Sequence, residues 1–133
     1  MMLFTLEEIQ KAEQKIKTGA DFPQFIQELK ALGVERNDIY VMNGMSIYFG
    51  KNDHTVEGPP AYEALLIEEQ SSVEDLREAL KVHQAGETDY QTFCRQAASA
   101  GVEKWVTDLN EMTVTYLDMA GNELVVEKIP SLG

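Results

Sequence analysis

Cysteine and tryptophan occur once each in this chain of 133 residues, as Cys94 and Trp105. A single cysteine excludes an intramolecular disulfide, which fits a reducing compartment. Basic residues are also scarce, because 11 Lys and Arg stand against 23 Asp and Glu, for a net charge of −12. Nucleic acids and anionic membranes are bound by clustered Lys and Arg, so neither is an expected partner.

Long apolar runs are missing as well. No stretch approaches the roughly 18 apolar residues that a membrane span needs. Acidic residues follow the first six positions, where a signal peptide would continue its apolar core. We therefore expect a cytoplasmic protein that does not interact with membranes.

Common catalytic motifs are also absent. The sequence contains no glycine-rich phosphate loop, no Gly-x-Ser-x-Gly and no His-Glu-x-x-His. His54 lies beside Asp53 and Glu57, but one histidine without a nearby cysteine is a weak metal signal, and a solvated histidine explains it better. We expect no cofactor and no bound metal.

An internal repeat organises what is present. The stretch from His83 to Asp118 has a looser copy from Lys17 to Gly50, and the two align when Gly33 is set over Gly101, an offset of 101 − 33 = 68 positions. Six of the thirty aligned positions (21–50 over 89–118) are identical. Matching helix caps, glycines and apolar periods in the same order support a duplication.

Each half begins with two predicted helices. In the first half, Thr5 with Glu8 forms a capping box for a helix expected to end near Gly19, and a second helix is expected from Asp21 to Gly33. In the second half, a third helix is expected to start at Ser72 with Asp75 and to end near Gly86. A capping box of Thr88 with Gln91 predicts the start of a fourth helix, which is expected to end at Gly101.

Three predicted strands follow each helix pair. Residues 39–42 and 45–49 are rich in β-branched and aromatic side chains, and Asn43-Gly44 between them predicts a type I′ hairpin turn. A third strand is expected through 54–56, and residues 62–69 are expected to cross to the second half in an extended conformation. The second set of strands is predicted at 104–109, 112–118 and 123–129.

The predicted class is α+β. One half alone cannot cover both faces of its strands, so we expect the halves to share a core within a single domain, residues 1–133, with repeat one at about 4–68 and repeat two at about 71–133. The expected architecture is a pseudo-twofold arrangement of an antiparallel sheet, continuous or split between the repeats, with the helices packed on one face.

The second half carries a family resemblance. The segments LKVHQAGETDYQTFCRQAASAGVEKW and TDLNEMTVTYLDMAGNE resemble a family of small bacterial proteins known as domain of unknown function 1398, some of which bear the label "phage envelope protein". The resemblance runs over nearly the whole chain and is looser in the first half. It implies membership of that family and no activity, cofactor or site residue.

The residues best suited to chemistry lie in the second half. Cys94 beside His83 would make a nucleophile and base pair, but Cys94 aligns with Ile26 on an apolar stripe, which favours a buried thiol. At an offset of 67, His83 aligns with Ile16 near the end of a predicted helix. The simpler interpretation is a half-buried histidine that caps carbonyl groups at this helix end. The alternative is that His83 acts as a general base or binds a ligand.

Trp105 breaks the repeat, because it aligns with Asn37. A core or subunit-interface role for the indole is favoured over stacking on a ligand. Asp108 lies near a strand end, where capping the next turn is favoured over acid/base chemistry. The candidate ligand-site residues, set in a groove between the repeats, are His83, Tyr90, Cys94, Trp105, Asp108 and Tyr116.

Two functions remain open on the sequence alone. The first is a non-enzymatic binding or interaction module that forms a homo-oligomer, most simply a dimer, through the sheet face that the helices leave uncovered. Apolar residues on both faces of the predicted hairpins favour it, since a half-solvated sheet normally shows cleaner alternation. The second is an enzyme or small-molecule receptor that uses the groove between the repeats.

Overall fold

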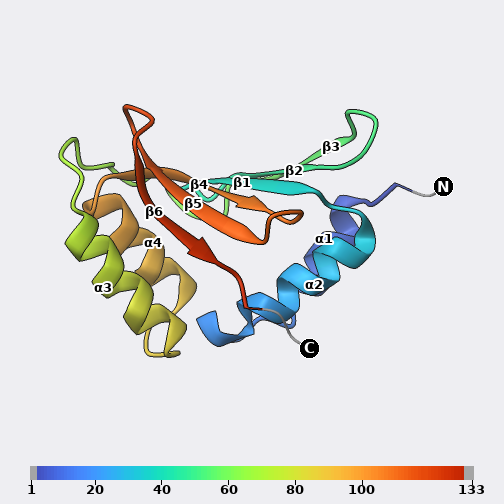
Figure 1. Ribbon diagram of the computed structural model, residues 1–133, viewed down its shortest axis with the longest axis horizontal. Coiled ribbons are helices and arrows are strands. Elements are labelled where there is room, and N and C mark those ends of the chain that lie inside the picture. Colours follow the sequence, from blue (N-terminus) through green and yellow to red (C-terminus); the bar gives the residue numbers. More distant parts are fainter. Residues whose placement is uncertain (1–2, 131–133) are drawn as a thin grey trace.

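All helices lie on one face of a single antiparallel sheet in the computed structural model, which describes residues 3–130 (Figure 1). The six strands have the order β3-β2-β1-β4-β5-β6. The strands are β1 (Arg36–Tyr40), β2 (Ser46–Phe49), β3 (Thr55–Gly58), β4 (Val102–Asp108), β5 (Thr113–Asp118) and β6 (Glu123–Lys128). The helices are α1 (Leu6–Glu13), α2 (Phe22–Leu32), α3 (Val73–Gln84) and α4 (Tyr90–Ser99), with a short 3₁₀ helix η1 (Gly19–Asp21) before α2. The predicted α+β class is confirmed, and the sheet is continuous between the two halves.

The central strands β1 and β4 join the halves symmetrically. Asp38 lies directly opposite Val106, and 106 − 38 = 68, which is the offset of the sequence repeat. On either side of this pair, Arg36 lies opposite Asp108 and Tyr40 lies opposite Lys104. A pseudo-twofold axis perpendicular to the sheet, between Asp38 and Val106, therefore exchanges β1 with β4, β2 with β5 and β3 with β6.

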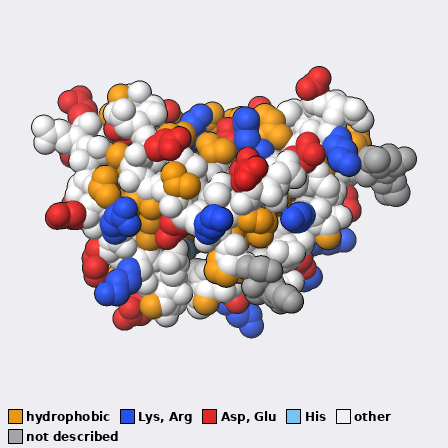
Figure 2. Space-filling model, in the orientation of Figure 1, with side chains coloured by type: hydrophobic (Ala, Val, Ile, Leu, Met, Phe, Trp, Pro, Cys, Tyr) orange, Lys and Arg blue, Asp and Glu red, His pale blue; other side chains and the backbone are white. Residues whose placement is uncertain are grey.

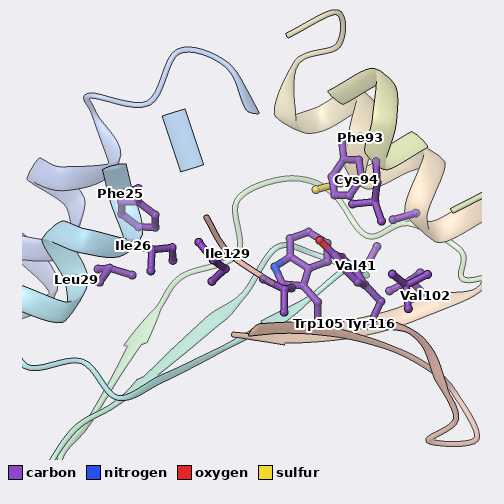
Figure 3. Close-up of a cluster of buried hydrophobic side chains, with 14 of the residues drawn as sticks. Phe25, Ile26, Leu29, Val41, Phe93, Cys94, Val102, Trp105, Tyr116 and Ile129 are labelled. Carbon is purple, nitrogen blue, oxygen red and sulfur yellow. The ribbon is translucent and has the colours of Figure 1, made fainter. Parts of the chain in front are cut away.

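The core lies between the sheet and the helices (Figure 3). Tyr48 and Tyr116, which the offset of 68 relates, are both buried on the helix-facing side. The Tyr48 hydroxyl donates to Oε1 of Glu13 at 2.8 Å, and the Tyr116 hydroxyl lies 3.5 Å from Oε1 of Glu127. Burial raises the pKa of both tyrosines, so both hydroxyls stay protonated and act as donors.

The predicted end of the first helix and the predicted start of the fourth helix are wrong. The first helix ends at Glu13 and not near Gly19, because Thr18 and Asp21 form a separate capping box around η1. Asp21 therefore accepts from the N–H groups of Lys17 and Thr18 and gives no side-chain cap to α2.

The start of the fourth helix also differs from the prediction. Asp89 is the N-cap of α4, and its Oδ1 accepts from Thr92 N at 2.7 Å. The predicted pair of Thr88 and Gln91 is displaced because the Thr88 oxygens contact His83 instead. The boxes at the starts of the first and third helices are correct, with Thr5 paired to Glu8 and Ser72 accepting from Asp75 N.

The predicted type I′ turn at Asn43-Gly44 is wrong, and such a turn occurs at Asn52-Asp53. Asn52 and Asp53 have φ of 57° and 61°, and His54 N donates to Lys51 O at 3.1 Å. Between β1 and β2 only Gly44 has positive φ, and a Cβ there would lie 2.8 Å from the Tyr62 ring. A side chain at position 44 would therefore collide with the segment that connects the two halves, which explains the glycine.

That connection, residues 59–72, contains no helix and runs beside the β1–β2 turn and α4. The Tyr62 hydroxyl donates to Val41 O at 2.6 Å, and Leu65 N donates to Met42 O at 2.6 Å. Glu68 N donates to Ala98 O at 2.9 Å. These bonds tie the irregular segment to elements of both halves.

Candidate functional site

An aromatic cluster surrounds Trp105 on the helix-facing side of β4. Its ring centroid lies 5.6 Å from that of Phe93, 5.8 Å from Tyr116 and 6.3 Å from Tyr90. Trp105 is only 5% exposed, whereas Tyr90 at the rim is 42% exposed. The indole therefore lies within the core, beside Phe93 and Tyr116 (Figure 3), and Tyr90 forms the outer edge of the cluster.

Cys94 lies on α4 and has no exposed surface. Burial raises the pKa of its thiol, although the nearby hydroxyls of Tyr62 and Tyr90 act in the opposite direction. A thiol with a raised pKa stays protonated at neutral pH and is a poor nucleophile. This position therefore does not provide the thiolate that acyl transfer would need.

His83 is half-buried at the end of α3 and holds the turn into α4. Its Nδ1 lies 3.1 Å from Thr88 O, so the Nδ1–H group donates to that carbonyl. The imidazole stacks on Phe93 with centroids 4.6 Å apart and planes 15° apart. A Cβ on Gly19 would lie 2.4 Å from His83 O, so η1 of the first half packs directly against this residue.

The charge state of His83 makes stability depend on pH. Burial lowers the pKa of the imidazole, while Thr88 O and Asp89 act to raise it. The unfolded chain thus binds a proton more readily than the folded one, and stability that is present above the unfolded pKa of about 6.5 is lost as the pH falls through the folded pKa.

We expect the wild-type melting temperature to fall more between pH 8 and pH 5 than that of His83→Asn. Thermal melts of both proteins across this range check it, and equal falls would contradict it.

The structure brings most of the predicted site residues together. Tyr90, Trp105 and Tyr116 are in one cluster, Cys94 is close to the Tyr90 hydroxyl, and Phe93, which was not among the predicted site residues, links His83 to Trp105. A signal for Phe93 existed, because it aligns with Phe25 on the apolar stripe.

Asp108 lies apart from this cluster, on the opposite face of the sheet. Its Oδ1 accepts from Asn110 N and from Glu111 N, both at 2.9 Å. This is the turn-capping role favoured by the sequence. A groove that contains all six predicted residues therefore does not form.

The hollows of the surface lie elsewhere. An open groove of about 370 Å³ runs between α3 and α4, and a smaller hollow of about 200 Å³ lies beside Tyr62 and Gln91. Neither is lined by Trp105 or His83. Within residues 3–130 no group of three or more His, Cys, Asp or Glu side chains is placed to hold a metal ion. Among the same residues, no helix is long and apolar enough to cross a membrane.

The face of the sheet opposite the helices is uncovered, and Figure 1 shows no element above it. Strand alternation and pairing register assign its side chains, because directly paired residues of antiparallel strands point to the same side. The open face consists of Thr55, Glu57, Ile47, Phe49, Arg36, Asp38, Tyr40, Lys104, Val106, Asp108, Thr113, Thr115, Leu117, Glu123, Val126 and Lys128.

Apolar and charged side chains are mixed on the open face. Val126 is 54% exposed, and the other apolar members Ile47, Phe49, Val106 and Leu117 are half-buried. Figure 2 shows this face from the side, along its upper edge, where hydrophobic side chains stand among basic and acidic ones. These five apolar side chains come from four of the six strands, β2, β4, β5 and β6, and Asp38 of β1 lies between Ile47 and Val106.

The charges of the open face are nearly balanced and partly fixed. Three bases, Arg36, Lys104 and Lys128, stand against four acids, Asp38, Glu57, Asp108 and Glu123.

Within the chain, Arg36 Nε donates to Asp38 Oδ1 at 3.1 Å, and the guanidinium lies 4.0 Å from the centroid of the Phe49 ring. Lys104 Nζ lies 5.5 Å from the centroid of Tyr40. Cation–π contacts of this kind hold the charged groups in place over the aromatic rings.

Comparison with known proteins gives a family and no activity. The model of the family described as "Protein of unknown function (DUF1398)" matches residues 10–128. The chain is 26% identical over 121 residues to "Uncharacterized protein YcgX" of Escherichia coli (strain K12), a match that covers 90% of each chain.

Proposed function

The chain belongs to the DUF1398 family of proteins of unknown function, and we propose that it is a non-enzymatic interaction module that self-associates through the open face of its sheet. The observation that carries the proposal is the group of apolar side chains on that face, Phe49 and Ile47 on β2, Val106 on β4, Leu117 on β5 and Val126 on β6. Single-layer sheets normally alternate apolar and polar faces cleanly, and a second apolar face favours a covering partner.

Charge supports a second copy as that partner. The whole chain carries a net charge of −12, so two copies repel each other over most of their surfaces. The open face is close to neutral, because three bases stand there against four acids. Approach of another copy is therefore least unfavourable through this face. The single cysteine, Cys94, supports a reducing compartment such as the cytoplasm.

The size of the open face sets the expected strength. Six strands about 4.8 Å apart and three rows of side chains about 6.8 Å apart give roughly 24 by 14 Å between outer Cα atoms. A standard stable interface buries about 800 Å² per partner, which is more than this area provides. We therefore propose weak, reversible dimers with a Kd in the micromolar range.

The alternative, an enzyme or small-molecule receptor between the halves, has less support. Its one favourable observation is the exposure of Tyr90 against Trp105. Against it stand the raised pKa of the Cys94 thiol and the position of Asp108 on the other side of the sheet.

Ile47→Lys tests the proposal. Ile47 lies between Asp38 and Glu57 on neighbouring strands, so a lysine there is compatible with the folded monomer but places an ammonium group in the proposed interface. We expect sedimentation equilibrium between about 5 and 500 μM to give a Kd for this variant at least roughly tenfold above that of the wild type.

Leu66→Lys is the matched control. It makes the same change in charge at a side chain that is 92% exposed and outside the open face, and it should leave the wild-type Kd unchanged. A wild type that stays monomeric throughout this range, or equal effects of the two variants, would overturn the proposal.

A further inference from the structure

The pairing register of β1 with β4 defines how two open faces can meet. A twofold axis parallel to the strands, midway between β1 and β4 and between two stacked sheets, places each residue opposite its own cross-strand neighbour in the other copy. Arg36 and Asp108 are such neighbours, and so are Tyr40 and Lys104. Sheets stacked in this way keep their strands aligned, which is the common mode of face-to-face packing.

Resting on the proposed self-association, we infer that two copies stack about this axis, with Arg36 of each copy bound to Asp108 of the other. The same operation sets Lys104 of each copy over the Tyr40 ring of the other. It also sets Ile47 against Thr115 and Phe49 against Thr113, since the axis exchanges β2 with β5. In the central row Asp38 faces Val106 and Glu57 faces Val126, so among these residues no two like charges meet.

The groups needed for the Arg36–Asp108 contact are available. Arg36 uses Nε and Nη2 for Asp38, and within residues 3–130 no acceptor binds its Nη1. Asp108 uses Oδ1 for two turn N–H groups, and no donor in the described part of the chain binds its Oδ2. The guanidinium is held over Phe49, so little side-chain freedom remains to be lost on binding.

The other face-to-face twofold axis fits less well. An axis perpendicular to the strands, in the same plane, would bring Lys104 opposite Asp108, but it would also bring Asp38 opposite Asp38 and Glu57 opposite Glu57 of the second copy. Two carboxylates would then face each other at the centre of the interface, which is unfavourable. The charge pattern thus selects the axis parallel to the strands.

Charge reversal in separate chains tests the inference. In Arg36→Asp, the new carboxylate of each copy faces Asp108 of its partner, and in Asp108→Arg, the new guanidinium of each copy faces Arg36. Each variant alone should therefore bind itself at least roughly tenfold more weakly than the wild type. In an equimolar mixture, the two introduced groups face each other and the native Arg36 of one variant faces the native Asp108 of the other, so we expect heterodimers to form. Sedimentation velocity with one variant fluorescently labelled at its N-terminal amine detects them.

The controls separate this inference from the proposed function. Arg36→Asp mixed with Leu66→Arg also combines an added acid with an added base, without the complementary contact, and should not show the gain of the reversed pair. Wild-type dimers without recovery in the reversed mixture would overturn the axis and leave the open face as the interface. A monomeric wild type would overturn both. Arg36→Glu with Asp108→Lys replaces the first pair if either variant fails to give a cooperative thermal melt.

Discussion

Replacement of Trp105 by alanine is expected to lower the free energy of unfolding by about 3–5 kcal/mol. The indole is 5% exposed and lies within 5.6–6.3 Å, centroid to centroid, of Phe93, Tyr116 and Tyr90. Truncation to alanine removes its buried apolar surface and leaves a cavity between β4 and α4 that three rings cannot collapse to fill. Urea denaturation monitored by circular dichroism measures the change.

Tyr90→Ala is the matched control for Trp105→Ala. Tyr90 contacts the same indole but is 42% exposed, so its removal leaves an open hollow that water can enter. Its cost should stay below about 2 kcal/mol. A loss under about 1 kcal/mol for Trp105→Ala would contradict a structural role for the indole and favour a ligand-facing one.

Gly101→Ala is expected to cost roughly 2–5 kcal/mol, the second large effect. Gly101 has φ of +86°, where a side chain costs about 1–2 kcal/mol. A Cβ there would also lie 2.7 Å from Ser71 Cα, and overpacking against backbone costs about 1–3 kcal/mol more. The same denaturation experiment measures this loss.

The repeat supplies the control for Gly101→Ala. Gly33 occupies the corresponding position with φ of +100°, but a Cβ there would meet nothing within 4 Å. Gly33→Ala should therefore show only the backbone term of about 1–2 kcal/mol. Equal losses at the two glycines would contradict the close approach of Ser71 to Gly101.

Local signals in the sequence were sufficient where no distant contact competed with them. Thr5 with Glu8 and Ser72 with Asp75 start their helices as predicted, because the capping partners are three residues apart and within residues 3–130 no other donor bonds to the Thr5 or Ser72 hydroxyl oxygen. Thr88 was predicted to cap α4, but His83 engages its oxygens, and Asp89 takes over the cap. The sequence does not reveal that contact.

The β1–β2 connection fails for a similar reason. Asn43-Gly44 is the strongest two-residue hairpin signal in the chain. The turn is longer because Asn43 O accepts from Ala61 N at 2.8 Å, a contact with the segment that links the halves. The type I′ turn occurs at Asn52-Asp53, where no such contact interferes with the short hairpin.

The faces of the strands were harder to predict than the strands themselves. Alternation places Arg36 and Asp38 on one face of β1, but only the pairing of β1 with β4 shows that Asp108 and Lys104 share that face. The grouping of Asp108 with Trp105 was avoidable, because the two lie three positions apart in the predicted strand 104–109 and alternation already places them on opposite faces. Pairing between halves is a long-range property that periodicity alone does not specify.

The most direct test of self-association through the open face is hydroxyl-radical footprinting of the wild type over a range of protein concentrations. Tyr40 and Phe49 are on the open face, and Tyr90 on the helix-bearing side is the internal reference. The proposed function predicts that oxidation of Tyr40 and Phe49 falls as the concentration rises through the micromolar range, while oxidation of Tyr90 stays constant. Unchanged oxidation of Tyr40 and Phe49 up to about 500 μM, or protection of Tyr90 instead, would contradict it.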